Sequence, residues 1–212
     1  MLVVLLILDA AISLAFSAVT VAEIGLLRRV RDGGFVSIAE AEANDERVGA
    51  AGIVLLVSFL VAGIVWLVWQ HRTHAALHRK GVRGLAFSSG WAVGWWFIPV
   101  ASLWKPFQVN REAWKASGGG DDWRTRPTWP LIGAWWGVYV LSNVLNVVAG
   151  AVPADADVGS YIAFDYVSIA GDLTGVLAAG LAITLVRSIA ARLTALEAAG
   201  PPLPPRPDTA IH

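Results

Sequence analysis

Three histidines at the end of an apolar stretch have the residue type and spacing closest to a metal site. His71, His74 and His78 are separated by three and four residues, so a helix would place them on one face. Imidazole nitrogens are common zinc ligands, but no carboxylate lies close enough in sequence to complete the site, and the chain contains no cysteine. We therefore predict that these histidines form the basic end of a helix at a membrane surface, and that no metal or other cofactor is bound. A metal-binding or cofactor-binding protein is the weaker interpretation.

Ionisable and amide side chains within apolar stretches are the second group with chemical potential. Asp165, Ser168 and Asp172 fall on one helix face, and Asn143 and Asn146 share a face in the preceding apolar run. A carboxylate in a membrane helix can carry protons or bind cations, and it can also hydrogen-bond to a neighbouring helix. We predict that Asp172 has the packing role, with one of the two asparagines as its partner.

The composition places the chain among membrane proteins. It is 56% hydrophobic and 15% charged, whereas soluble domains carry ~25% charged residues. Lysine plus arginine equals aspartate plus glutamate, at 16 each, so net charge predicts no nucleic-acid partner. No nucleophile is paired with a general base, and we therefore expect no enzyme. The expected partners are the lipid bilayer and either further copies of the chain or another membrane protein.

Five apolar segments supply the elements that must position these residues. Each reaches the ~20 residues that a membrane-crossing helix needs, and they cover residues 2–27, 48–70, 85–104, 129–150 and 160–186. The predicted fold is all-α, a multi-pass integral membrane helix bundle formed by residues 1–195 as a single domain. Residues 196–212 are rich in proline and predict a disordered tail.

The polar residues of the first segment form a stripe along one helix face. Asp9, Ser13, Ser17, Thr20 and Glu23 follow one another at steps of four, four, three and three residues. Lipid cannot satisfy such groups, so we predict that the stripe faces other helices.

Two helix starts can be read from local signals. Ser37 followed by Glu40 is a capping-box pattern, which predicts a helix from Ile38 into the second apolar segment. Pro106 suits the first turn of a helix that would run to about Ser117.

The segment 91–114 differs from the other apolar runs because it holds five of the eleven tryptophans and two prolines. Pro99 and Pro106 have no N–H for the carbonyls four residues earlier, so a helix here must kink, break or restart. We favour a fifth membrane span at 85–104. The alternative is four spans plus a re-entrant segment, which dips into the membrane and returns.

A pattern of tryptophan, proline and charged residues runs between residues 68 and 117 and continues further along the chain. Its positions are Trp69, Arg72, Trp91, Trp95, Trp96, Pro99, Trp104, Lys105, Pro106 and Glu112, followed later by Trp135, Trp136 and Asn143. This pattern resembles that of a bacterial membrane family called domain of unknown function 4328. The resemblance implies a multi-pass membrane protein with the same order of apolar segments. It implies no reaction, ligand or partner.

The distribution of lysine and arginine predicts how the chain is oriented. Residues 105–128 carry five of them, the C-terminal residues 187–212 carry three, and residues 151–159 carry none. By the positive-inside rule the first two regions are cytoplasmic and 151–159 lies outside the cell membrane. Both the four-span and the five-span topology give this result, and they differ on the side of the N-terminus.

The expected role is that of a scaffold or regulatory membrane protein. The alternative is a small transporter or channel in which Asp9, Asn143, Asn146, Asp165 and Asp172 face one cavity. One polar cavity reached from several helices would favour transport, whereas separate pairwise contacts would favour a scaffold.

Overall fold

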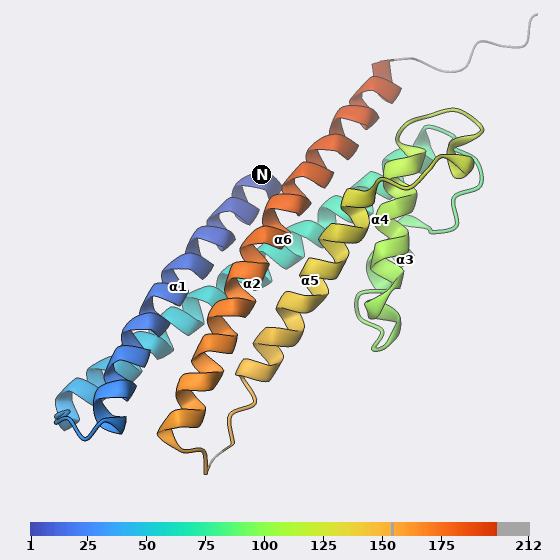
Figure 1. Ribbon diagram of the computed structural model, residues 1–212. Helices are drawn as coiled ribbons and strands as arrows, with labels where there is room; N and C mark the ends of the chain where they lie inside the picture. Colours follow the sequence, from blue (N-terminus) through green and yellow to red (C-terminus); the bar gives the residue numbers. More distant parts are fainter. Residues whose placement is uncertain (154, 199–212) are drawn as a thin grey trace, which may run out of the picture.

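The computed structural model describes residues 1–153 and 155–198, and the regular elements within these ranges are all helical. Four helices are long: α1 (Leu2–Arg31), α2 (Ile38–Arg79), α5 (Pro130–Ala149) and α6 (Val158–Ala198). Two are short, α3 (Ser89–Gly94) and α4 (Lys105–Ala116), and two are single 3₁₀ turns, η1 (Ala101–Leu103) and η2 (Trp123–Thr125). The four long helices lie side by side in an elongated bundle (Figure 1). The all-α prediction is confirmed for these residues, and most of the proline-rich tail predicted from residue 196 lies outside them.

Four helices of the described residues are long and apolar enough to cross a membrane, and the preferred five-span prediction is wrong. In place of a helix over 85–104, the chain forms α3, turns back through η1 and continues as α4. The reversal has a local cause: the N–H of Ala101 donates to the carbonyl of Pro99 at 2.6 Å, around Val100 with φ 64°. This is a tight three-residue turn, placed where proline interrupts helical hydrogen bonding. The path agrees with the alternative of four spans and a segment that turns back.

Both predicted helix starts are confirmed. Ser37 is the N-cap residue of α2, and its hydroxyl accepts the N–H of Glu40 at 3.2 Å. The Glu40 carboxylate pairs with Arg29 of α1, which ties the first two helices together at this end. In α4, Pro106 occupies the first turn, where a missing N–H costs nothing.

Polar groups join the long helices in pairs. Asp172 accepts a hydrogen bond from Ser17 of α1 at 3.0 Å, and Asp9 accepts one from Ser58 of α2 at 2.7 Å. The stripe on α1 therefore faces other helices, as predicted. The partner predicted for Asp172 is wrong, because the side-chain amides of Asn143 and Asn146 donate to carbonyls of their own helix at 2.8 and 3.1 Å.

The apolar stretches turn most of their surface outward, as lipid-facing helices do. In the most apolar 18-residue stretch of each long helix, no more than 17% of the residues are buried in α1, α2 or α5, and 39% are buried in α6. Helices of 42 and 41 residues, α2 and α6, are roughly 60 Å long, so both extend well beyond a hydrocarbon core of about 30 Å.

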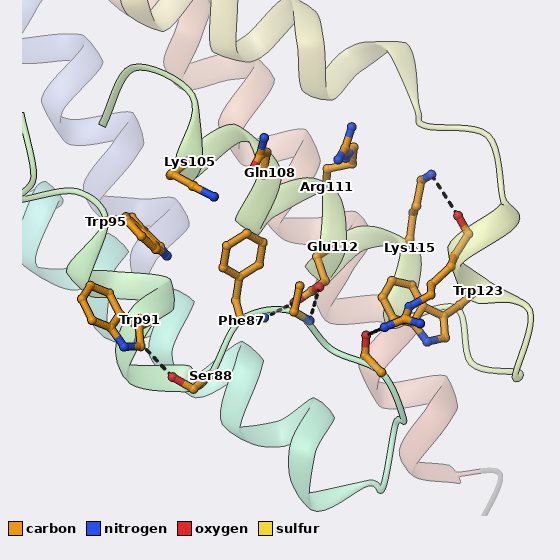
Figure 2. A pocket seen from close by; sticks show the side chains of 13 residues that line it. Phe87, Ser88, Trp91, Trp95, Lys105, Gln108, Arg111, Glu112, Lys115 and Trp123 are labelled. Atoms are coloured by element: carbon orange, nitrogen blue, oxygen red, sulfur yellow. Dashed lines mark hydrogen bonds between the residues drawn. The ribbon is translucent and has the colours of Figure 1, made fainter. Parts of the chain in front are cut away.

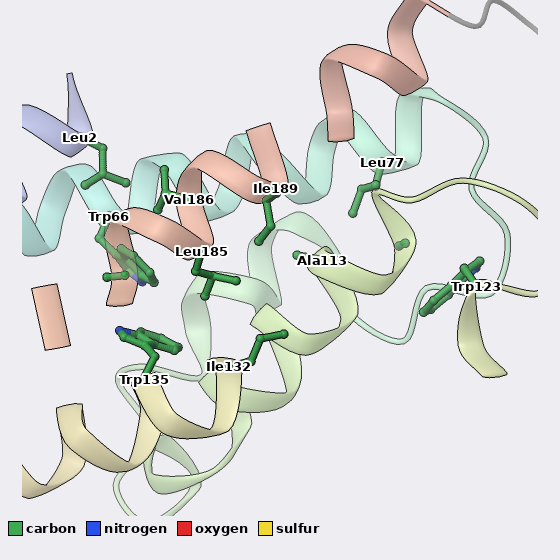
Figure 3. Close-up of a cluster of buried hydrophobic side chains, with 12 residues drawn as sticks. Leu2, Trp66, Leu77, Ala113, Trp123, Ile132, Trp135, Leu185, Val186 and Ile189 are labelled. Atoms are coloured by element: carbon green, nitrogen blue, oxygen red, sulfur yellow. The ribbon is translucent and has the colours of Figure 1, made fainter. Parts of the chain in front are cut away.

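The best-buried core lies at one end of the bundle (Figure 3). We call this end the helical cap and define it as residues 71–79 of α2, α4, η2 and residues 187–198 of α6. Several of the most deeply buried side chains lie there or directly beside it: Leu77, Val109, Ile132, Leu185 and Ile189. A compact folded unit therefore sits where the long helices leave their apolar stretches.

The contact between α5 and α6 gives a direct test of helix packing. A Cβ added at Gly171 would lie 2.7 Å from the side-chain oxygen of Asn146, whereas a Cβ at Gly180 would meet nothing within 4 Å. Alanine is the better helix former, so Gly180→Ala is expected to raise the free energy of unfolding by about 0.5–1 kcal/mol. Gly171→Ala is expected to lower it by about 1 kcal/mol, because overpacking outweighs the gain. Unfolding in mixed SDS micelles measures both, and equal effects would contradict this close approach.

Candidate functional site

Helix α4 has one apolar face and one polar face. The apolar face is buried in the helical cap and includes Pro106, Val109, Ala113 and Ala116. The polar face follows steps of three and four residues and carries Lys105, Gln108, Arg111, Glu112 and Lys115. This polar face is one wall of a cavity.

The cavity has a volume of about 760 Å³ and opens to the surface (Figure 2). Its opposite wall is made by Gly84, Ala86, Phe87 and Ser88 together with Trp91 and Trp95, and η2 contributes Trp123 and Arg124. A volume of this size is within the roughly 300–1,000 Å³ of small-molecule sites. Cationic and aromatic side chains dominate the lining.

Glu112 holds the two walls together. Its carboxylate oxygens accept the backbone N–H of Ala86 at 2.7 Å and of Phe87 at 3.2 Å, and the residue is 7% exposed. Burial raises the pKa of Glu112, and the two N–H donors and nearby Arg124 partly oppose that effect. The loop over residues 84–88 is therefore fixed to α4 by a buried acid.

The η2 turn closes one end of the cavity. The Arg124 guanidinium donates to the carbonyl of Gly84, and the Trp123 indole donates to the carbonyl of Arg83 at 3.1 Å. Gly84 has φ +76°, and a Cβ there would collide with the Arg124 guanidinium. Lys115 donates to the Arg124 carbonyl at 3.4 Å.

Aromatic rings position the two remaining cations. The Lys105 ammonium lies 4.9 Å from the ring centroid of Trp95 and 5.7 Å from that of Phe87. The Arg111 guanidinium lies 5.6 Å from the ring of Phe107. Ring faces carry partial negative charge and hold such cations without neutralising them.

The three histidines do not converge on one point. His71 is exposed, His78 bonds the carbonyl of Phe87 at 3.1 Å, and fully buried His74 bonds the carbonyl of Gln70 at 3.2 Å through Nδ1. Across residues 1–153 and 155–198, no group of three metal-binding side chains comes together.

His74 nevertheless lies next to Glu112, one of the residues that line the cavity. Its Nε2 is 3.8 Å from Oε1 of Glu112. Burial lowers the pKa of His74 to about 4, so the ring is neutral at pH 7 and this contact is not an ion pair.

Of the residues singled out from the sequence, Trp91 and Trp95 line the cavity. Trp69 and Trp96 belong to an aromatic cluster that joins α2 to α5 and also includes Trp66, Trp135, Trp136 and Tyr139. The others lie apart from the cavity: Arg72 is exposed on α2, Pro99 and Trp104 are exposed in the turning segment, Pro106 is buried under α4, and Asn143, Asp165 and Asp172 lie on α5 and α6.

The sequence analysis assigned none of the charged residues of the cavity to a site. They are Lys105, Arg111, Lys115 and Arg124, together with Glu112; Lys105 and Glu112 entered only as matching positions of the resemblance. The uncharged lining residues Gly84, Ala86, Phe87, Ser88, Gln108 and Trp123 were missed as well. The polar spacing along 105–115 was the signal that could have identified one wall.

A model of one protein family matches most of the chain, including the cavity. The family is described as Domain of unknown function (DUF4328), and the match covers residues 32–191 of 212. No curated protein and no solved structure matches the chain. The match extends over α2 to α6, which confirms the resemblance carried by the tryptophan and proline positions. The chain therefore belongs to the DUF4328 family.

Proposed function

We propose that the protein is an integral membrane protein with a scaffold or regulatory role and no catalytic activity of its own. The observation that carries this proposal is that two intramembrane carboxylates, Asp9 and Asp172, each accept a hydrogen bond from one hydroxyl of a neighbouring helix and do not share a site. Asp9 pairs with Ser58, and Asp172 pairs with Ser17, each across a different helix interface. Transport would instead need polar groups from several helices around one water-filled path. The polar cavity described above lies beside the helical cap, away from these pairs.

The outward apolar surface supports the bilayer as the first partner. An apolar groove of about 360 Å³ lies between α1 and α2, and its lining includes Leu8, Ile12, Ile53 and Val57. Another membrane helix can pack into a groove of this kind. A second copy of the chain or another membrane protein is therefore the proposed protein partner.

Substitution of Asp172 separates a packing role from transport. Asp172→Asn keeps a hydrogen-bonding group of the same size and is expected to keep the stability of the parent. Asp172→Leu removes the contact with Ser17 and is expected to lower the free energy of unfolding by about 1 kcal/mol. Thr184→Val is the matched control, because Thr184 bonds only the carbonyl of Gly180 in its own helix. Unfolding in mixed micelles provides the measurement.

Flux measurements in proteoliposomes complete this test. The parent is expected to conduct neither protons nor sodium ions above the level of empty liposomes. A flux that the parent supports and the folded Asp172→Asn variant loses would replace the scaffold proposal with transport.

We further propose that residues 105–128 and the C-terminus are cytoplasmic and that 151–159 lies outside. Since four spans return the chain to its starting side, the N-terminus and the end of α2 are then cytoplasmic too. A cysteine at exposed Lys80 is expected to be protected from an impermeant thiol reagent added to intact cells, whereas one at exposed Asp155 is expected to react. The chain has no cysteine of its own to interfere. Labelling at Lys80 and protection at Asp155 would reverse the orientation.

A further inference from the structure

The cavity beside α4 concentrates positive charge that carboxylates do not neutralise. Lys105, Arg111, Lys115 and Arg124 all line it. Among the residues that the structure describes, no carboxylate oxygen lies within 4.0 Å of any of these four cationic groups. Like charges gathered in one concave site favour the entry of an anion.

The carboxylate in the lining does not remove this preference. Glu112 is buried, and both of its oxygens accept backbone N–H groups of Ala86 and Phe87. These two N–H groups occupy the carboxylate oxygens of Glu112 and compensate its charge within the loop contact. The field at the open side of the cavity is then set by the cations.

Two of the four cations retain their hydrogen-bond donors for a ligand. Lys115 and Arg124 donate to backbone carbonyls within the site. The side chains of Lys105 and Arg111 donate no hydrogen bond to the described part of the chain. Each lies over an aromatic ring that limits its motion. An arginine fork and a lysine ammonium that line the same cavity are donors suited to phosphate oxygens.

The position of the cavity favours phosphate over other anions. The turning segment between α3 and α4 carries exposed apolar side chains, Phe97 at 71%, Val100 at 66% and Leu103 at 58%. Figure 1 shows this segment turning back alongside α5, which carries an apolar stretch, while the cavity lies toward the helical cap. An apolar tip next to a cationic cavity matches a membrane surface, where lipid phosphates are the abundant anions.

We propose that this cavity binds a phosphate group, with Arg111 and Lys105 as its direct donors and with Lys115 and Arg124 supplying additional positive charge. The phosphate belongs either to the headgroup of an anionic lipid or to a free phosphate in solution. Trp91 and Trp95 provide the apolar wall that the carbon part of a lipid headgroup would contact. The inference does not depend on the scaffold or regulatory role proposed above.

Binding is tested with the full chain, delipidated in an uncharged detergent. One arm titrates short-chain phosphatidylglycerol, with short-chain phosphatidylcholine as the comparison, and counts bound lipid by native mass spectrometry. The other arm titrates inorganic phosphate by calorimetry. The parent is expected to bind one molecule of phosphatidylglycerol or one phosphate ion per chain, with phosphatidylcholine at least about tenfold weaker because its headgroup carries no net charge.

A matched pair of double variants locates the site. Lys105→Gln with Arg111→Gln removes the two direct donors, and Arg79→Gln with Lys80→Gln removes the same charge outside the cavity, at the end of α2. The first is expected to weaken binding about tenfold or more, since it removes both charge-assisted hydrogen bonds to the phosphate. The second is expected to bind within about twofold of the parent. Helical circular dichroism checks that both are folded, and Arg111→Lys, which retains the charge, is expected to give intermediate affinity if the double variant fails to fold.

Each outcome decides the proposal. Binding of phosphatidylglycerol alone supports a lipid headgroup, and binding of inorganic phosphate supports a free phosphate. The proposal is wrong if the parent binds neither probe, if phosphatidylcholine binds as well as phosphatidylglycerol, or if the two double variants lose affinity equally. Equal affinity of Arg111→Lys and the parent would remove Arg111 as a direct donor.

Discussion

Replacing Glu112 with alanine is expected to lower the free energy of unfolding by about 2–3 kcal/mol and to release the loop over residues 84–88. The substitution removes the acceptor of two backbone N–H groups and leaves a void beside buried His74. A hydrogen bond to a charged acceptor contributes about 1.5–3 kcal/mol, and water at the exposed loop recovers part of the loss. Glu112→Gln is expected to cost less, because the amide keeps one acceptor oxygen and avoids burying a charge.

Hydrogen exchange gives the local readout for the same variants. The amides of Ala86 and Phe87 are expected to exchange faster in Glu112→Ala than in the parent, while amides in the middle of α2 keep their rates. Glu46→Ala is the matched control, since Glu46 is exposed on a helix, and it is expected to change stability by no more than about 0.5 kcal/mol. Unchanged exchange at Ala86 and Phe87 would show that Glu112 does not hold this loop.

The parts of the fold that the sequence predicted correctly depend on local signals. The long apolar runs locate α1, α2, α5 and α6 because hydrophobic length is a property of one segment. The start of α2 at Ile38 and the position of Pro106 in the first turn of α4 follow from side chains within three residues of the helix end.

The errors arise where the answer depends on tertiary structure. An uncharged run at 85–104 is long enough to cross a membrane, but the turn at Val100 reverses it. Helical periodicity correctly placed Asp172 on a buried face, yet periodicity does not say which neighbouring helix that face meets, and the partner is Ser17.

The candidate site was missed for a related reason. The bond from Glu112 to Ala86 spans 26 residues and exists only because the chain turns back between α3 and α4. From the sequence alone, the basic residues of 105–128 predict only the orientation of the chain. Their spacing along α4 gives them a second role, since one helix face gathers Lys105, Arg111 and Lys115 on the cavity.

Acidification from pH 7.5 to pH 5 is expected to cost about 2 kcal/mol of stability through His74 alone. In the unfolded chain His74 has the ordinary histidine pKa of 6.5, and in the folded protein burial lowers that pKa to about 4. Between these two values the unfolded chain binds a proton that the folded protein does not. The stability contributed by neutral His74 is therefore fully present above pH 6.5 and decreases as the pH falls toward 4.

Glu112, the acid nearest to His74, acts in the opposite direction. Burial raises its pKa, so the folded protein takes up its proton more readily than the unfolded chain does. The hydrogen bond of His74 to Gln70 and its unfavourable interactions with His78 and His71 are smaller influences than burial. The contribution of His74 is thus best measured as a difference between the parent and a variant that lacks the ring, in which the effect of Glu112 largely cancels.

His74→Gln supplies that difference. Glutamine is close in size, can still donate to the Gln70 carbonyl, and does not titrate. Between pH 7.5 and pH 5 the parent is expected to lose about 2 kcal/mol more than His74→Gln, as measured by unfolding in mixed micelles at each pH. His71→Gln, which removes an exposed histidine one turn earlier on α2, is expected to follow the parent. If the parent and His74→Gln gave parallel pH profiles, the buried ring would be taking up a proton in the folded protein, and the contact with Glu112 at 3.8 Å would then be an ion pair.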